Sequence, residues 1–155
     1  MAEHDVAQAS RYRLIPNGYD YGLFKSSGLI VSTGMGSSAW LYSAKQIFPL
    51  KVSNIFDRIG DNTQDVEINN ALALKISNEA KFDRREHRMS FYVREGFSLK
   101  NRTEGFCETL DVTSEMLNGL LLIDGWWEAN LALGQTIKLE TGGPERMLSH
   151  LILKV

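Results

Sequence analysis

The stretch of this chain whose residue types and spacing best suit ligand chemistry reads Gly34-Met35-Gly36-Ser37-Ser38-Ala39. Its two glycines allow backbone conformations and close approaches that a side chain would block. A helix that starts just after them would direct free backbone amides, with their partial positive charge, toward an anion or a polar ligand edge. Taken literally, the spacing matches the G-x-G-x-x-A fingerprint of dinucleotide-binding folds, with Asp57 as the acid that binds the ribose.

The elements on either side of this stretch would have to hold it in place. Before it, residues 29–31 form an uninterrupted apolar run typical of a strand buried on both faces, and Ser37 or Ser38 offers a hydroxyl to cap a following helix. After it, apolar residues recur on one face over residues 40–48, and Pro49 lies where it would end or kink that helix. The pattern then continues as helix to Ile59, whereas a dinucleotide-binding unit needs a second parallel strand there, so the fingerprint reading is the weaker one.

The amino-acid sequence of the same region resembles that of the NAD kinase family. Gly28-Leu29-Ile30-Val31-Ser32-Thr33, followed by Gly34-Met35-Gly36-Ser37-Ser38-Ala39-Trp40, is similar to the family's strand and glycine turn, and Ser26-Ser27-Gly28, Gly34 and Ala39-Trp40 are nearer to its mitochondrial-type members. Fainter similarity continues at residues 91–95 and in the Asp-Gly turn at residues 121–125. The resemblance covers most of the chain but is specific only in the first segment.

The resemblance implies a set of residues for the NAD pocket. On the nicotinamide and ribose side these are Thr33, Gly34, Met35, Gly36, Ser38, Ala39, Trp40 and Ser43. Arg94, at the end of a predicted strand, is placed to reach a phosphate. Ser27 replaces the family's usual Asp and Met35 its usual small polar residue, so the hydrogen bonds of those groups are missing here. Trp40 fits two roles, stacking on a ligand ring or packing in the core.

The resemblance extends only to the C-terminal, NAD-binding domain of these two-domain enzymes. The family's catalytic Gly-Gly-Asp-Gly loop belongs to an N-terminal α/β domain and does not occur in this sequence. The intact enzyme would phosphorylate NAD to NADP with ATP and Mg²⁺, but we expect the chain alone to be inactive, with no catalytic residue of its own. By resemblance it would bind NAD or NADP and self-associate as a dimer or tetramer.

Composition narrows the other possibilities. The chain has 155 residues, the size of a single domain spanning 1–155, and its net charge of −2 provides no basic field to attract nucleic acid or acidic membranes. His4, His87 and His150 are too far apart in sequence to suggest a metal site, and Cys107 is expected to be a small buried hydrophobe. No apolar run is long enough to cross a bilayer. The N-terminus lacks a targeting signal, so the mitochondrial location is implied by resemblance alone, and the chain would otherwise be cytoplasmic.

The rest of the sequence predicts a mainly β domain with a helical insertion, an antiparallel sandwich-like sheet of the kind found in the C-terminal domain of NAD kinases. Asn17-Gly18 predicts a hairpin between strands at residues 11–15 and 19–25, with Tyr12, Tyr19 and Tyr21 packing across it. Residues 66–80 favour a helix capped by Asp65, although an alternation there also fits a strand. Five further strands are expected at residues 87–95, 105–113, 118–123, 135–141 and 148–155, with a hairpin turn at residues 142–144.

Two functions outside the NAD kinases remain as alternatives. Lipid kinases share the two-domain architecture, and their β domain would contain an apolar channel for a lipid. The third possibility is a nucleotide-binding or scaffolding module without catalysis. Binding of NAD, NADP, ATP and diacylglycerol would distinguish these functions.

Overall fold

The structure, a computed structural model, describes residues 1–4, 8–60, 65–96, 102–142 and 151–154, the last of these by their backbone only. Most elements are strands, and every strand pair within these ranges is antiparallel. The strands are β1 (Ala2–Glu3), β2 (Ser10–Pro16), β3 (Gly22–Ser26), β4 (Gly28–Thr33), β5 (Met89–Arg94), β6 (Glu104–Cys107), β7 (Thr109–Ser114), β8 (Gly119–Ile123), β9 (Trp127–Leu131), β10 (Thr136–Thr141) and β11 (Leu151–Lys154). The helices are the short 3-10 helix η1 (Gly34–Gly36), α1 (Trp40–Lys45), α2 (Pro49–Ile59) and α3 (Val66–Asn78).

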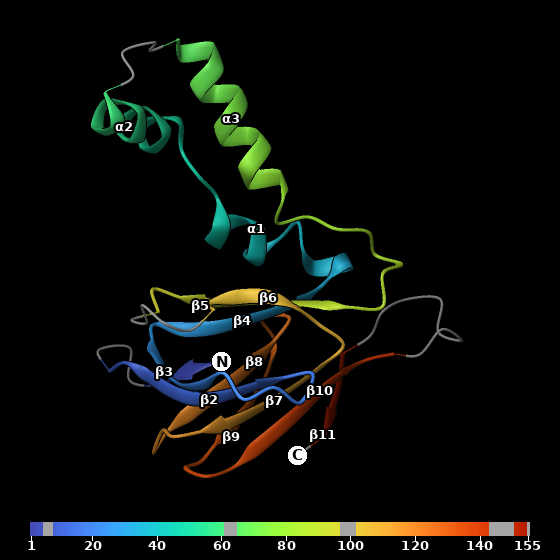
Figure 1. The fold of residues 1–155 in the computed structure, drawn as a ribbon. Coiled ribbons are helices and arrows are strands. Elements are labelled where there is room, and N and C mark those ends of the chain that lie inside the picture. Colours follow the sequence, from blue (N-terminus) through green and yellow to red (C-terminus); the bar gives the residue numbers. More distant parts are fainter. Residues whose placement is uncertain (5–7, 61–64, 97–101, 143–150, 155) are drawn as a thin grey trace.

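The strands form three sheets around one hydrophobic core. Their orders are β1-β8-β9, β11-β10-β7-β2-β3 and β4-β5-β6. Figure 1 shows the β4-β5-β6 sheet lying over the five-stranded sheet, between that sheet and the helices. Buried side chains from all three sheets meet in the core: Tyr12, Leu14, Phe24, Leu29, Met89, Phe91, Val93, Cys107, Leu110, Val112, Leu121, Leu131, Ile137 and Leu139. The predicted antiparallel β domain with a helical insertion is confirmed at this level.

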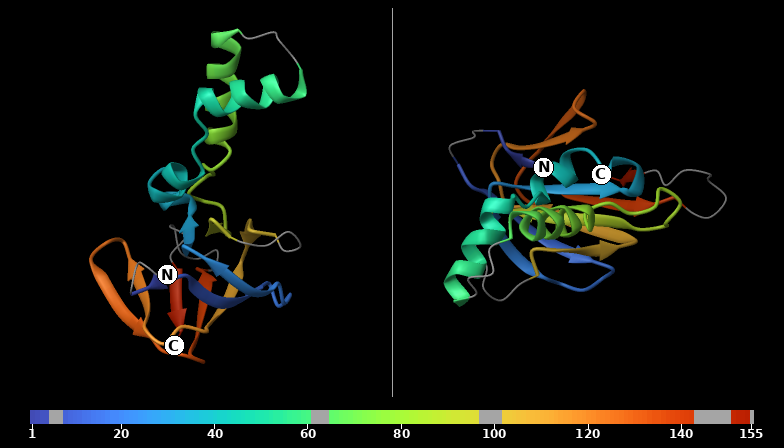
Figure 2. Two further views of the ribbon diagram at one scale, coloured as in Figure 1. Left: turned by 90° about the vertical axis from the view of Figure 1, so that its left-hand side faces the viewer. Right: turned by 90° about the horizontal axis from the view of Figure 1, so that it is seen from above.

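Helices α2 and α3 form an arm that projects from the β sheets. The left-hand view in Figure 2 shows the two helices standing clear of the strands, joined to them through α1 and the chain that leads into β5. Within the arm, Val52 of α2 and Ala73 of α3 are buried. The rest of the arm has few neighbours, which leaves several of its large apolar side chains exposed to solvent.

The hairpin predicted around Asn17-Gly18 is confirmed, because β2 and β3 pair with Tyr12 opposite Phe24. Both turn residues have positive φ, 49° and 79°, the conformation that Asn and Gly tolerate best. The second strand begins later than predicted, at Gly22, because the amide of Tyr19 donates to the Pro16 carbonyl and extends the turn. Tyr12 stacks on Phe24 as expected.

The other two tyrosines of the hairpin differ from each other. Tyr21 packs edge-on against Phe91, with ring centroids 6.0 Å apart. Phe91 belongs to β5 in another sheet, and Tyr19 is 73% exposed, so the prediction of packing across the hairpin is wrong for both tyrosines.

The described strands change sheet five times along the chain, and at two of these crossings a single residue links the two strands. Ser27 separates β3 from β4, and Gly28, the first residue of β4, has φ of +147° where the chain passes from the five-stranded sheet to the β4-β5-β6 sheet. The strand predicted at residues 105–113 is wrong as a single element, because its two ends belong to different sheets. It divides at Glu108 into β6, which pairs with β5, and β7, which pairs with β2 and β10.

Two of the described strands were not predicted by the sequence pattern. One is β1 near the N-terminus, where Ala2 pairs with Leu120 of β8. Strand β9 starts at Trp127 and pairs with β8, while Trp126 lies in the turn and is 81% exposed. Of the strand predicted at 148–155, residues 151–154 form β11 beside β10, and the remainder lies outside the described residues, as do Gly143 and Pro144 of the predicted hairpin turn.

The predicted helices are present with different limits. The first ends at Lys45, and α2 begins separately at Pro49, which suits a first helical position because proline has no amide to leave unpaired there. Helix α3 ends at Asn78, two residues before the predicted limit, and the Asp65 carboxylate accepts a 2.8 Å hydrogen bond from the Glu67 amide. The helical alternative at residues 66–80 is therefore the correct one, and its predicted cap is confirmed.

Candidate functional site

The glycine-rich stretch forms a bend between β4 and α1, and its first glycine is packed against protein. A Cβ at Gly34 would overlap the carbonyl group of Asp83, lying 2.6 Å from its carbon and 2.8 Å from the Cα of Arg84. At Gly36 a Cβ would lie 2.8 Å from the Ser32 hydroxyl oxygen. The predicted close approach exists, but at Gly34 the chain segment 83–84 makes it, so this residue is structural and contacts no open space.

Ser37 fastens the bend to the segment that leads into β5. This residue is buried, and its hydroxyl donates to the Gly34 carbonyl at 2.7 Å and accepts from the Phe82 amide at 3.3 Å. The residue that caps α1 is Ala39, which makes no side-chain cap bond, so the prediction of a Ser37 or Ser38 cap is wrong. The Ser37 hydroxyl is engaged on both sides and is not available to a helix end.

The expectation of free amides at this helix start is only partly met. The Ser37 amide donates to the Gly34 carbonyl and the Ala39 amide to the Gly36 carbonyl. These bonds close the bend on itself, so fewer donors face outward than a longer helix with a hydroxyl cap would present. Binding here would depend on the cavity walls more than on the helix start.

A cavity of about 540 Å³ opens beside the bend, within the range of small-molecule sites. Its walls come from β4 and the bend on one side and from β8, β7 and β10 on the others. Most of the lining is apolar, with polar groups from Ser32, Thr33 and Asp124. The lining residues are Met1, Leu29, Val31, Ser32, Thr33, Met35, Gly36, Val112, Leu121, Leu122, Ile123, Asp124, Ile137 and Leu139.

Asp124 lines the cavity, although the sequence alone indicated it only as part of a turn. It and Gly125 have φ of 51° and 76°, which fits the tight hairpin between β8 and β9. The same turn brings Asp124 to the cavity that Thr33 lines, although 91 positions separate the two residues (124 minus 33). The Asp-Gly pair and its resemblance to the NAD kinase turn were the only sequence signals for this position.

The predicted site residues therefore separate into groups. Thr33, Met35 and Gly36 line the cavity. Four others contribute nothing to the lining of this cavity or of the second hollow described next: Gly34, Ser38, Ala39 and Ser43. Ser43 is exposed, and its hydroxyl donates to the Ala39 carbonyl at 3.4 Å.

Trp40 and Arg94 meet away from this cavity. The guanidinium carbon of Arg94 lies 5.8 Å from the centre of the Trp40 ring, within the range of a cation–π contact. Trp40 is 57% exposed, so the core role considered for it is wrong. Arg94 also lines a second hollow of about 780 Å³, where Lys25 adds another positive charge and Glu3 and Glu95 add carboxylates.

The literal dinucleotide fingerprint is contradicted by the topology. Strand β4 pairs antiparallel with β5, and the chain after the bend enters α1, α2 and α3 without a parallel strand. Asp57 lies on α2, in the arm that stands away from the sheets (Figure 1). It is therefore not placed as the ribose-binding acid of such a unit.

The described residues offer little for nucleophilic or metal chemistry. Cys107 is 2% exposed, as predicted, and burial raises the pKa of its thiol to about 12, so it remains protonated. Within the part of the chain that the structure describes, no three His, Cys, Asp or Glu side chains gather as a metal site would require. None of its helices is long and apolar enough to span a membrane.

No family model matches the chain, and no curated protein matches its sequence.

Proposed function

We propose that this chain is the NAD-binding, self-associating domain of a mitochondrial-type NAD kinase, an enzyme that transfers the γ-phosphate of ATP to NAD with Mg²⁺. Its sheets would then correspond to the sandwich-like C-terminal domain of that family. One observation carries the proposal: three residues of the bend whose sequence resembles NAD kinases, Thr33, Met35 and Gly36, form a wall of an open cavity. If the bend bordered no cavity, the residues that resemble NAD kinases would have no adjacent site in which to bind a ligand.

The chemistry of the cavity supports a nicotinamide nucleoside as its occupant. Apolar side chains of β4, β8 and β10 provide surfaces for a flat ring, and the Thr33 hydroxyl and Asp124 carboxylate can accept hydrogen bonds from amide or ribose groups. Arg94, beside Trp40, lies away from this cavity and lines the second hollow, where its positive charge suits a phosphate.

Catalysis would need groups that this sequence does not contain. Phosphoryl transfer depends on positioning the nucleophile, the metal ion and the triphosphate together, and the Gly-Gly-Asp-Gly loop that does this in the family is missing here. The purified 155-residue chain should therefore bind NAD without forming NADP from NAD and ATP.

Titration calorimetry with NAD, NADP, ATP and diacylglycerol tests the proposal. NAD or NADP should bind and diacylglycerol should not. Binding of diacylglycerol alone would favour the lipid-kinase alternative, which the mainly apolar lining of the cavity also suits. ATP binding alone, or no binding at all, would refute the NAD site and leave a module without this chemistry.

A matched pair of charge-removing variants makes the test specific to the cavity. Asp124→Asn keeps the turn, since Asn tolerates positive φ, and removes the carboxylate charge at the cavity. Losing a hydrogen bond to a charged group costs about 1.5–3 kcal/mol, so the NAD dissociation constant should rise by a factor of about 10 to 100. Asp57→Asn, in the arm, should leave it unchanged, and equal effects of the two variants would contradict the assignment.

A further inference from the structure

Helix α3 exposes one face that nothing in the described structure covers well. Asn69, Ala73 and Ser77 form its buried face, four residues apart. On other sides Ile68 is 55% exposed and Leu74 58% exposed, although both are large apolar side chains. Figure 1 shows this helix in the arm, away from the sheets, so the β core does not shield these side chains.

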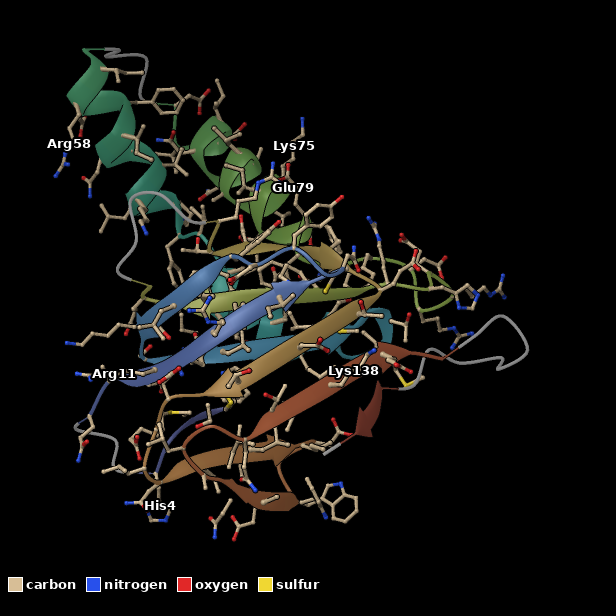
Figure 3. The ribbon with its side chains drawn as sticks, turned by 60° about the horizontal axis from the view of Figure 1, so that its bottom comes forward. His4, Arg11, Arg58, Lys75, Glu79 and Lys138 are labelled. Carbon is tan, nitrogen blue, oxygen red and sulfur yellow. The ribbon has the colours of Figure 1, made fainter. Side chains whose placement is uncertain are left out.

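The residues of this face are arranged symmetrically about Ala71. Ile68 and Leu74 lie three positions before and after it, and Glu67 and Lys75 lie four positions before and after it. Positions three and four apart share a helix face, so these five residues form one stripe. Glu67 and Lys75 are the only charged residues of α3, and they have opposite signs. Figure 3 shows Lys75 on the arm, with its side chain pointing outward.

We propose that this stripe binds the α3 helix of a second copy of the chain, antiparallel and across a two-fold axis near Ala71. Such an axis makes the contact self-complementary, because each residue meets the position equally far on the other side of the centre. Ile68 then packs against the partner's Leu74, and Glu67 faces the partner's Lys75. Ala71 meets the partner's Ala71, and its small side chain lets the helices approach closely.

The charges of Glu67 and Lys75 favour a second copy of the chain over an uncharged apolar partner. In the antiparallel arrangement, opposite charges face each other twice, whereas parallel helices in register would place Glu67 against the partner's Glu67 and Lys75 against the partner's Lys75. Like-charge contacts of that kind oppose association. The sequence of α3 therefore complements itself in one direction only.

The size of the stripe sets how strong the association can be. A 13-residue helix is about 20 Å long, and a standard stable interface buries about 800 Å² per partner. A contact through α3 alone falls short of that area. The dimer should consequently depend on protein concentration.

This inference specifies the surface for the self-association included in the proposed function, but it does not require NAD binding. The two fail separately. Calorimetry can show no nucleotide binding while the chain dimerises through α3, and NAD can bind to a chain that remains a monomer.

Sedimentation equilibrium of the 155-residue chain over a range of concentrations tests the surface with a charge exchange. Lys75→Glu or Glu67→Lys alone should weaken the dimer at least tenfold, because each creates two like-charge contacts. The double variant should recover the original constant, and mixing the two single variants should give a heterodimer stronger than either homodimer. A monomer at every concentration, unchanged single variants or an unrecovered double variant would overturn the proposal.

Disulfide formation provides an independent test. Ala71→Cys places two thiols at the proposed axis, and the native Cys107 is buried and should not compete. Mild oxidation should give a covalent dimer much faster than for Asn54→Cys, an exposed position on α2. Equal rates for the two variants would reject the two-fold contact at Ala71. Circular dichroism of each variant shows whether the helices remain folded.

Discussion

Gly34→Ala should destabilise the protein more than any other single methyl group added to the bend. The new Cβ would lie 2.6 Å from the carbonyl carbon of Asp83 and 2.8 Å from the Cα of Arg84, about 1 Å closer than ordinary carbon contacts of 3.5–4.0 Å. Both of these neighbours are backbone atoms, so no rotamer change relieves the overlap. Either the end of β4 or the segment 83–84 must move by about 1 Å.

The magnitude follows from what such a movement disrupts. Overpacking of this kind costs about 1–3 kcal/mol, and separating the segments also weakens the 3.3 Å hydrogen bond from the Phe82 amide to Ser37, for about 1 kcal/mol more. Replacing glycine restricts the unfolded chain and returns about 0.4–1 kcal/mol. The net loss is about 2 kcal/mol, which lowers the melting temperature by about 4–8 °C for a domain of this size.

Gly36→Ala is the matched control. Its Cβ would meet only the Ser32 hydroxyl oxygen, at 2.8 Å, and that side chain can rotate away by giving up its 2.9 Å bond to the Thr33 carbonyl. The cost of about 1 kcal/mol is then largely offset by the restriction of the unfolded chain. In a Ser32→Ala background, Gly36→Ala should become less costly still.

Urea unfolding followed by circular dichroism measures these differences, and hydrogen exchange at the Phe82 amide reports whether the bend has separated from the segment behind it. Exchange there should accelerate in Gly34→Ala and remain slow in Gly36→Ala. A loss within 0.5 kcal/mol for Gly34→Ala, or equal losses for the two variants, would refute the reasoning, because packing against residues 83–84 would then not explain the glycine.

Two further predictions concern buried titratable groups. Cys107, whose pKa burial raises to about 12, should resist a disulfide reagent at pH 8 until the protein unfolds. Because the unfolded thiol titrates near 9.0, its contribution to stability is complete below that pH and is lost as the pH rises toward 12, a trend that Cys107→Ala should weaken in unfolding measurements from pH 8 to 11. Tyr12→Phe removes the 2.6 Å hydrogen bond between the tyrosine and Ser26 hydroxyls and should cost about 1–2 kcal/mol in urea unfolding, whereas the exposed Tyr19→Phe should cost almost nothing. Equal losses for the two tyrosines would show that the buried bond contributes nothing.

Several elements could be predicted from the sequence because their causes are local. Asn17 and Gly18 accept positive φ themselves, and the Asp65 carboxylate bonds an amide two residues away. Pro49 cannot continue an α1 hydrogen-bond ladder but suits the start of α2. The apolar run at Leu29 likewise makes a buried strand wherever a core is available. In each case the neighbours that decide the conformation are within a few residues.

The candidate site depended on contacts that no local pattern contains. Asp124 reaches the cavity of Thr33 because β8 and β4 face the same core, and Gly34 must be glycine because residues 83–84 pass over it. The strand predicted at residues 105–113 divides because its two ends pair with strands of different sheets. Local periodicity records which face of an element is apolar, but only the folded chain determines what that face meets. The sequence by itself therefore determined most of the helices and strands and the resemblance of the bend to NAD kinases. Tertiary packing decided which residues of the bend border an open cavity.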